Sequence, residues 1–256
     1  MDKTINAPQM FGIFNKKYDQ PLFEGLCDFH NHLLPGIDDG SKSVGMSVEM
    51  LRLYDQLGFS RIIATPHVYQ ELYPNTPETI GKAFTVLSQE LATPDHKGLK
   101  PDGYGAEYMV DETFLAALDK GTPQLLIDGR YILVEMHFFG QTSMIEAACF
   151  GLCQQNLYPI LAHPERYNLI DKLETYRELK NKGFYLQLNA LSLMGHYGPA
   201  VKEKAQQLLA AGLYDFVATD AHHPGHLQQL QKLTLTKKQG VYWEAIAAFQ
   251  KTKFGV

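Results

Sequence analysis

Short apolar runs alternate with longer amphipathic segments along most of the chain. The short runs have the length and pattern of buried strands, and each is followed by a segment with helical periodicity. We expect seven strands, in the runs LCDFHNHLL, RIIATPH, GYGAEYMV, RYILVEMHF, YPILAHPE, FYLQLNAL and YDFVATDAHH. The pattern therefore predicts a chain of β/α units.

The segments between these runs are predicted to be helices. Residues 43–57 carry apolar side chains at helical spacing and are followed by Gly58, a common helix stop. Residues 77–91 begin with Thr76-Pro77, with Glu78 in the first turn. Further helices are expected at 111–118, 143–156, 171–182, 199–211 and 241–251, whereas 94–101 has the composition of a loop and 124–128 receives no firm assignment.

Strands that alternate with helices in this way favour a parallel sheet, and about seven units favour a closed or nearly closed barrel. The chain has 256 residues, a length usual for one α/β barrel. We expect one domain over residues 26–256 and an extension over 1–25. The extension carries the patch MFGIFNKKY, which could pack on the domain, stay disordered, bind a partner or touch a membrane surface.

Composition excludes several functional classes. The formal net charge is −5, and the basic residues form no blocks, which argues against nucleic-acid binding as the main activity. Three cysteines cannot build a disulfide framework in this chain, and the first residues lack a signal-peptide pattern. No apolar run approaches the roughly 18 residues of a membrane span. A cytoplasmic protein is expected.

The first strand ends in a candidate metal site. His30 and His32 alternate along it, so both imidazoles point to the same side. Pro35-Gly36 then breaks the strand, and the turn Asp38-Asp39-Gly40 returns carboxylates toward it. Two such histidines could also be ordinary core or surface groups, and the two aspartates are equivalent in this pattern.

Ligand-type side chains also stand at the ends of the other predicted strands, where a parallel barrel has its active site. Singly, each has an ordinary explanation, such as a solvated histidine, an internal ion pair or a helix cap. These explanations do not account for all of the residues together, because charged residues within apolar strands are rarely left without a partner or a metal. The candidates are His30, His32, Asp39 (or Asp38), His67, Glu107, Glu135, His163, Asp220 and His222.

Five imidazoles and four carboxylates without a nearby thiolate suit manganese, iron or zinc better than a calcium or magnesium cage. Four carboxylates neutralise two divalent ions, whereas three ions would leave about two positive charges for a hydroxide and an anionic substrate. Nine ligands also serve three ions more naturally than two. We expect two or three ions, with three favoured and Mn²⁺ the leading candidate.

Arg166 lies three residues after His163, and its guanidinium could bind phosphate through two hydrogen bonds. A salt bridge to Glu165 or another acid would also explain an arginine at this position. Asp28 could orient His30, although a core or ion-pair role would also explain it. His137 could support a ligand, donate a proton or be a partly buried histidine. Aromatic residues in loops after the ligand strands could line a pocket for a flat ring or anchor the loops. They are Tyr69, Tyr73, Phe138, Phe139 and Tyr167, of which Tyr69 and Tyr167 are the expected substrate contacts.

The motifs FHNHLLPGIDDGS, IIATPHV, GAEYM, LVEM, LAHPERY and TDAHH, in this order, resemble the PHP (polymerase and histidinol phosphatase) superfamily. Within it the chain is similar to the bacterial CpsB/CapC (YwqE-like) tyrosine-protein phosphatases. The resemblance implies a distorted seven-stranded PHP-type (β/α)7 barrel with the active site at the C-terminal ends of the strands. It also favours Asp39 over Asp38 as a ligand and makes Arg166 the phosphate-binding arginine.

The resemblance further implies hydrolysis of phosphotyrosine on a bacterial tyrosine autokinase that controls capsule or exopolysaccharide synthesis. A metal-bound hydroxide would attack phosphorus, with Arg166, Asp220 and His222 acting at the phosphoryl group. A cysteine mechanism is excluded, because Leu33, Gln155 and Pro159 stand six residues after the three cysteines where that mechanism needs arginine.

Two other functions stay open. One is a PHP phosphatase of a small phosphomonoester such as histidinol phosphate, which would need a narrow pocket closed by loops. The other is a non-catalytic metal-binding regulator that docks the kinase, which missing ligands would favour.

Overall fold

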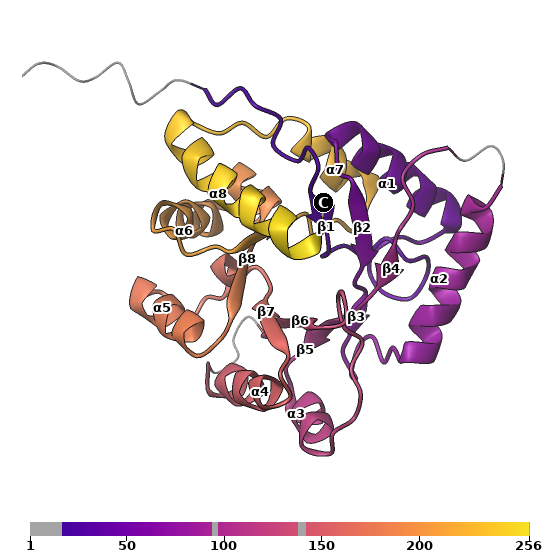
Figure 1. The fold of residues 1–256 in the computed structure, drawn as a ribbon, viewed down its shortest axis with the longest axis horizontal. Helices are drawn as coiled ribbons and strands as arrows, with labels where there is room; N and C mark the ends of the chain where they lie inside the picture. The colour runs from indigo at the N-terminus through magenta and orange to yellow at the C-terminus, as the bar shows by residue number, and fades with distance from the viewer. Residues whose placement is uncertain (1–16, 94–96, 138–141, 256) are drawn as a thin grey trace, which may run out of the picture.

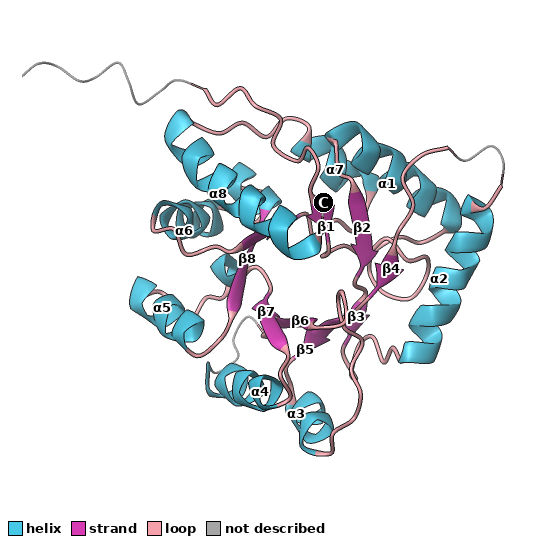
Figure 2. Ribbon diagram, in the orientation of Figure 1, coloured by secondary structure: helices cyan, strands magenta, loops and turns pink. Residues whose placement is uncertain are grey.

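The computed structural model describes residues 17–93, 97–137 and 142–255. Within these ranges, short strands surround a common interior and the helices lie outside them (Figure 1, Figure 2). The strands are β1 (Cys27–Asp28), β2 (Arg61–Ala64), β3 (His67–Val68), β4 (Gly103–Tyr104), β5 (Glu107–Met109), β6 (Tyr131–Glu135), β7 (Tyr158–Leu161), β8 (Tyr185–Asn189) and β9 (Phe216–Ala218).

The helices follow the strands in the predicted order. The α-helices are α1 (Val44–Leu57), α2 (Pro77–Leu91), α3 (Glu112–Asp119), α4 (Thr142–Gln154), α5 (Leu173–Asn181), α6 (Pro199–Ala210), α7 (Pro224–Leu230) and α8 (Lys237–Phe254). Two 3-10 helices, η1 (Pro164–Arg166) and η2 (Ala190–Met194), follow β7 and β8. The short helix α7 was not predicted, and 124–128 forms neither a helix nor a strand.

All strand pairs are parallel, but they form two sheets, ordered β1-β2-β4 and β3-β5-β6-β7-β8-β9. The second predicted strand is divided at Thr65-Pro66, since a proline has no N–H for the ladder. The third is divided at Gly105-Ala106. The structure therefore confirms an α/β fold with a curled parallel sheet, while the expected count of seven strands is not confirmed.

Backbone hydrogen bonds connect the first and last strands. Asp220 N donates to His30 O at 2.8 Å, and His32 N donates to Ala221 O at 3.0 Å. The ends of β1 and β9 are thus held side by side. Because these residues directly follow or adjoin the strands, the connection also brings the predicted ligands of both strands together.

The interior of the curled sheet is apolar at the end where the strands begin. Phe29, Leu133, Ile160 and Phe216 belong to one buried cluster there, and Phe254 of α8 packs among them. The Phe254 ring centroid lies 4.8 Å from that of Phe29 and 5.4 Å from that of Phe216. This aromatic packing closes the interior on one side, so the ligand side chains lie toward the other side.

The described part of the predicted extension, residues 17–25, packs against α8. Tyr18 N donates to Leu235 O, the Tyr18 hydroxyl donates to Glu244, and the Trp243 indole donates to Leu22 O. Phe23 is buried against the Trp243 ring. Residues 1–16, with most of the apolar-then-basic patch, lie outside the described residues. In the described ranges, no helix combines the length and apolarity needed to cross a membrane.

Gly240 of α8 offers a test of this packing. A Cβ atom there would lie 2.1 Å from Cδ2 of Tyr18, whereas a Cβ at Gly45 of α1 would meet only the Ser43 hydroxyl at 4.0 Å. Gly45 lies in the first turn of α1, so Gly45→Ala should stabilise the protein by less than the gain of about 0.5–1 kcal/mol that is usual in a helix interior. Gly240→Ala should instead lower the free energy of unfolding in urea and expose 17–25 to limited proteolysis. Equal gains from both substitutions would contradict the docking of Tyr18.

Candidate metal centre

The turn after β1 folds back over His32. Gly36 has a φ of 74°, and Ser41 N donates to His32 O at 2.9 Å. A Cβ atom at Gly40 would lie 2.1 Å from His32 O, so only glycine permits this approach. The turn thereby places Asp38 and Asp39 beside the strand end, as the sequence predicted.

The two aspartates have different surroundings. Asp38 is buried, and its Oδ2 lies 2.8 Å from His32 Nδ1 and accepts a bond from His67 N. The side chain of Asp39 is 48% exposed and faces the Nε2 atoms of His67 and His222. Asp38 therefore orients an imidazole, whereas Asp39 can offer its carboxylate to a metal.

Gln187 of β8 orients His30 in the same way. Its Oε1 lies 2.9 Å from His30 Nδ1 and also accepts a bond from His163 N. An amide oxygen can only accept, so Nδ1 carries a proton, and Nε2 is the nitrogen that could bind a metal in exchange for its own proton. Asp28, the expected partner of His30, instead accepts bonds from Thr219 N and Oγ1.

The deepest candidate site joins four buried side chains. His30 Nε2 lies 3.1 Å from Glu107 Oε2 and 3.3 Å from Asp220 Oδ1. His32 Nε2 lies 3.4 Å and 3.3 Å from the same two oxygens. One potential ligand atom of each residue lies within 4.8 Å of the others, a spacing that one ion could bridge.

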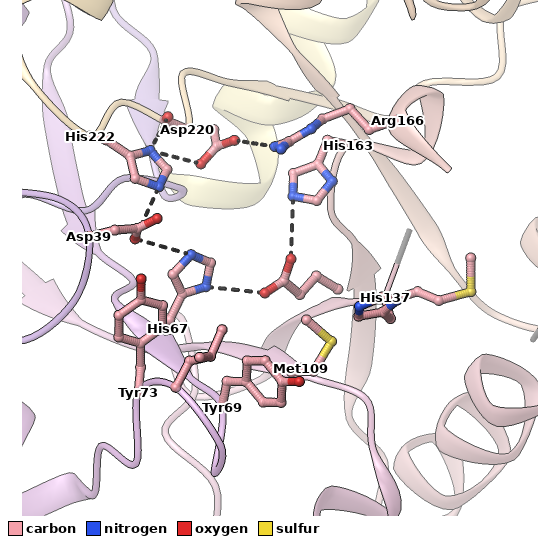
Figure 3. A pocket seen from close by; sticks show the side chains of 13 residues that line it. Asp39, His67, Tyr69, Tyr73, Met109, His137, His163, Arg166, Asp220 and His222 are labelled. Carbon is pink, nitrogen blue, oxygen red and sulfur yellow. Dashed lines mark hydrogen bonds and ion pairs between the residues drawn. The ribbon is translucent and has the colours of Figure 1, made fainter. Parts of the chain in front are cut away.

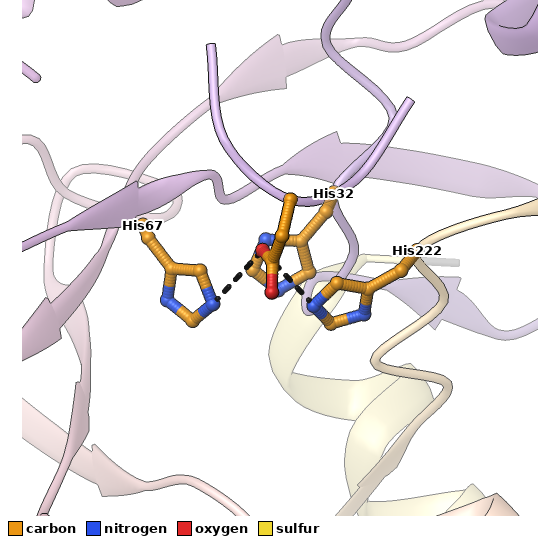
Figure 4. A group of neighbouring side chains, drawn as sticks. His32, His67 and His222 are labelled. Atoms are coloured by element: carbon orange, nitrogen blue, oxygen red, sulfur yellow. Dashed lines mark ion pairs between the residues drawn. The ribbon is translucent and has the colours of Figure 1, made fainter. Parts of the chain in front are cut away.

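A second candidate site lies nearer the surface and includes His32, Asp39, His67 and His222 (Figure 4). Asp39 Oδ1 lies 3.5 Å from His67 Nε2 and 3.4 Å from His222 Nε2. The ring centroids of His32 and His222 are 4.0 Å apart. Asp39 therefore sits between imidazoles that come from β3 and from the loop after β9.

A third group consists of His67, Glu107 and Glu135. His67 Nδ1 lies 3.1 Å from an oxygen of each carboxylate. His163 adjoins this group, with Nε2 3.2 Å from Glu107 Oε1 and 3.9 Å from Glu135 Oε2. All nine residues singled out in the sequence thus gather in one region, with His32, His67 and Glu107 shared between groups.

The carboxylates dominate the electrostatics of this region. Burial opposes a charged imidazole at His30, but Glu107 and Asp220 raise its pKa to about 10. Burial likewise opposes a charged Glu107, yet His30 and His67 hold the pKa of that carboxyl well below its usual range. A potential that retains protons on buried imidazoles also favours divalent cations.

Several buried atoms fit a metal better than a hydrogen bond. His30 Nε2, His32 Nε2, His67 Nδ1 and Glu107 Oε2 are buried and form no hydrogen bond within the described ranges. Unsatisfied buried polar atoms are rare and cost roughly 1–3 kcal/mol each. These atoms point at one another, so cations between them would satisfy the whole set. Mixed imidazole and carboxylate donors suit manganese, iron or zinc.

The backbone is strained at two of the nine candidate ligands, His163 and Asp220. His163 has a φ of 34° and Asp220 a φ of 50°, a left-handed conformation that non-glycine residues seldom adopt. Both residues stand just after a strand. The unusual conformation directs their side chains into the cluster, which indicates that the surrounding structure enforces it.

A cavity of about 290 Å³ opens over the cluster (Figure 3). Asp39, Glu135, Asp220 and His222 contribute to its lining, and so does Arg166. Arg166 Nη1 donates to Asp220 Oδ2 at 2.9 Å. Apolar and aromatic side chains complete the wall, namely Tyr69, Leu72, Tyr73, Met109 and Met136, and His137 lies beside them. The cavity thus combines metal-type ligands, one guanidinium and an aromatic wall.

Not every expected contact is found. Tyr167 is buried, and its hydroxyl donates to Ala162 O and accepts from Met136 N, so the expected substrate contact is wrong. Tyr69 does line the cavity, whereas Phe138 and Phe139 lie outside the described residues. The Glu165 carboxylate accepts bonds from Asn189 N and the Tyr214 hydroxyl, while Arg166 pairs with Asp220.

Comparison with known proteins agrees with this geometry. Tyrosine-protein phosphatase YwqE of Bacillus subtilis is 32% identical over 200 residues, which are 77% of this chain and 78% of YwqE. Tyrosine-protein phosphatase CpsB of Streptococcus pneumoniae is 28% identical over 228 residues, which are 84% of this chain and 91% of CpsB. Both matches extend over most of each protein.

A solved structure has the same fold. It comes from work on YwqE of Bacillus subtilis and CpsB of Streptococcus pneumoniae, described as unique metal-dependent tyrosine phosphatases. It superposes with a TM-score of 0.69 and 29% identity, covering 90% of this chain and 88% of that one. The family described as "Capsular polysaccharide synthesis, CpsB/CapC" matches residues 26–241. This chain therefore belongs to the CpsB/CapC family of capsular polysaccharide synthesis proteins.

Proposed function

We propose that this protein is a metal-dependent protein-tyrosine phosphatase. The observation that carries the proposal is the cluster of five imidazoles and four carboxylates at the floor of a cavity that also contains Arg166. Such a cluster suits phosphoester hydrolysis, and the relatives named above are tyrosine phosphatases. No expected ligand is missing, which disfavours a non-catalytic regulator.

The cluster would hold three divalent ions, with Mn²⁺ as the leading candidate. Each of the three overlapping groups offers one site, and His32, His67 and Glu107 each belong to two groups. Because Asp38 occupies Nδ1 of His32, that imidazole would hold an ion through Nε2 alone. His163 would complete the group that contains Glu107 and Glu135. Ions bound there would supply Lewis acidity toward the phosphoryl oxygens and a nucleophile at neutral pH.

The protein itself would bind and orient the ester. Arg166 presents a guanidinium to the phosphoryl oxygens, and Asp220 and His222 border the same part of the cavity. The wall formed by Tyr69, Leu72 and Tyr73 would receive the aromatic ring of phosphotyrosine. Leu72 is 65% exposed at this wall, which suits a substrate presented on another protein.

The physiological substrate would be the tyrosine-phosphorylated tail of an autokinase that acts in capsule or exopolysaccharide synthesis. The family description, capsular polysaccharide synthesis, supports the role in capsule synthesis. Such a substrate would place the protein in the cytoplasm, close to the membrane.

The fold would be a seven-stranded PHP-type barrel. In that description β2 and β3 together form one interrupted strand, and β4 and β5 together form another.

A comparison of substrates tests the proposed function. With Mn²⁺, the protein should hydrolyse para-nitrophenyl phosphate and a phosphotyrosine peptide much faster than a phosphoserine peptide or histidinol phosphate, because the wall of the cavity is aromatic. Phosphate release is measured for all four compounds, with and without a chelator. A preference for histidinol phosphate would support the small-metabolite phosphatase instead, and full activity in chelator would contradict the metal mechanism.

Glu107→Gln tests the metal cluster, because Glu107 contributes to two of the three groups. The variant should bind at least one Mn²⁺ fewer per chain than the parent protein, and excess Mn²⁺ should not restore activity. Metal content is measured after gel filtration. Asp128→Asn is the matched control, since this carboxylate pairs with Arg61 away from the cluster. Equal metal content in parent protein and Glu107→Gln would contradict the assignment.

Asp38→Asn tests the orientation of His32. Loss of a partner that orients a ligand typically weakens metal affinity by roughly 10–100-fold. The variant should therefore need more Mn²⁺ for half-maximal activity but recover its rate at saturating Mn²⁺, in contrast to Glu107→Gln. Titration of activity with Mn²⁺ measures both quantities. An unchanged Mn²⁺ concentration for half-maximal activity would show that Asp38 stabilises the turn without affecting metal binding.

A further inference from the structure

The two oxygens of Asp220 have different partners. Oδ1 lies 3.3 Å from both His30 Nε2 and His32 Nε2, on the side of the metal-type ligands. Oδ2 accepts two hydrogen bonds of 2.9 Å, one from Arg166 Nη1 and one from Asn189 Nδ2. The carboxylate therefore connects the candidate metal cluster to the guanidinium in the cavity.

The guanidinium of Arg166 also lies over an aromatic ring. Its Cζ lies 4.3 Å from the ring centroid of Tyr197, a distance at which a cation is attracted to a π-system. The Tyr197 hydroxyl in turn accepts a 2.9 Å bond from Asn189 Nδ2. Asp220, Arg166, Tyr197 and Asn189 thus form a closed ring of contacts.

Asn189 fixes this ring to the fold. Its side chain is fully buried, and its Oδ1 accepts a bond from Leu191 N at the start of η2. Its Nδ2 serves both Asp220 and Tyr197. One amide therefore sets the positions of the carboxylate and the ring between which the guanidinium lies.

We propose that Tyr197 and Asn189 are positioning residues that hold the Arg166 guanidinium flat beside Asp220, ready to bind a phosphoryl group. The inference rests on the proposed function, because it assigns Arg166 a phosphate ester as ligand. A guanidinium recognises phosphate through N–H donors that lie in its plane. A ring against one face fixes that plane, and the bond to Asp220 fixes its rotation. Tyr197 therefore raises phosphate affinity without touching phosphate or metal.

The test compares Tyr197→Leu with Tyr197→Phe in Mn²⁺-loaded full-length protein, with inorganic phosphate as the probe. Loss of the ring should raise the dissociation constant for phosphate about fivefold, a usual effect for a cation–π contact. Tyr197→Phe keeps the ring and should change it less than about twofold. Tyr197→Met removes the ring but keeps the bulk, and it should behave like Tyr197→Leu. The Mn²⁺ concentration for half-maximal thermal stabilisation should stay unchanged in all three.

Two controls separate positioning from general stability. Tyr158→Leu removes a half-exposed tyrosine at the start of β7, away from the cavity, and should not change phosphate affinity. In an Arg166→Met background, Tyr197→Leu should cause no further loss, because its effect passes through the guanidinium. Additive losses, or an equal loss of Mn²⁺ affinity, would overturn the inference.

These measurements test the positioning role of Tyr197 separately from the proposed phosphatase activity. A protein that cleaves phosphotyrosine peptide but binds phosphate equally well with tyrosine or leucine at position 197 would refute the positioning role alone. A protein that binds phosphate with the expected dependence on Tyr197, but does not cleave the peptide, would refute the phosphatase assignment alone.

Discussion

The site depends on the contacts between the Glu107 carboxylate and the surrounding histidines. This carboxylate is fully buried, and its two oxygens lie within 3.4 Å of nitrogen atoms of His30, His32, His67 and His163. A buried carboxylate needs compensating positive charge, which protonated imidazoles or bound cations can supply. The four histidines come from β3 and from the segments after β1 and β7. A one-residue slip in any of these strands would turn its ligand away.

The same strands build both the apolar core and the polar cluster. Along β6, Leu133 faces the inner apolar cluster, and Glu135, two residues later, faces the ligands. Phe216 lies on the inner apolar side of β9, whereas Asp220 follows that strand and enters the cluster through a left-handed backbone conformation. Strand periodicity, together with this local conformation, thus sends side chains of both kinds to one interior. Packing at the end closed by Phe254 offsets the cost of gathering like charges at the other end.

Much of this arrangement could be predicted from the sequence, because charged residues inside apolar runs are rare and parallel strands align their C-terminal ends. The residues that hold the candidate ligands in position could not be predicted in this way. Gln187 and Asn189 are neutral amides in the run FYLQLNAL, and their roles become visible only when the segments after β1 and β9 supply His30 and Asp220.

The prediction for Tyr167 was wrong for a related reason. A position just after a strand does not fix the direction of a side chain, and this hydroxyl turns back to Ala162 O in the core. The seven predicted runs form nine strands in the described ranges, because two runs are interrupted, one at Thr65-Pro66 and one at Gly105-Ala106.

Charge couples the binding of metal and phosphate. The four carboxylates of Asp39, Glu107, Glu135 and Asp220 lie among imidazoles, and Glu107 and Asp220 raise the pKa of His30 to about 10, so the metal-free cluster retains protons. Divalent ions would replace such protons and add positive charge beside Arg166, so that the ions and Arg166 could act together on one phosphoryl group. Because Asp220 contacts both the ligand cluster and Arg166, whatever fixes this carboxylate affects both partners. Linkage then requires that phosphate strengthen metal binding as much as metal strengthens phosphate binding.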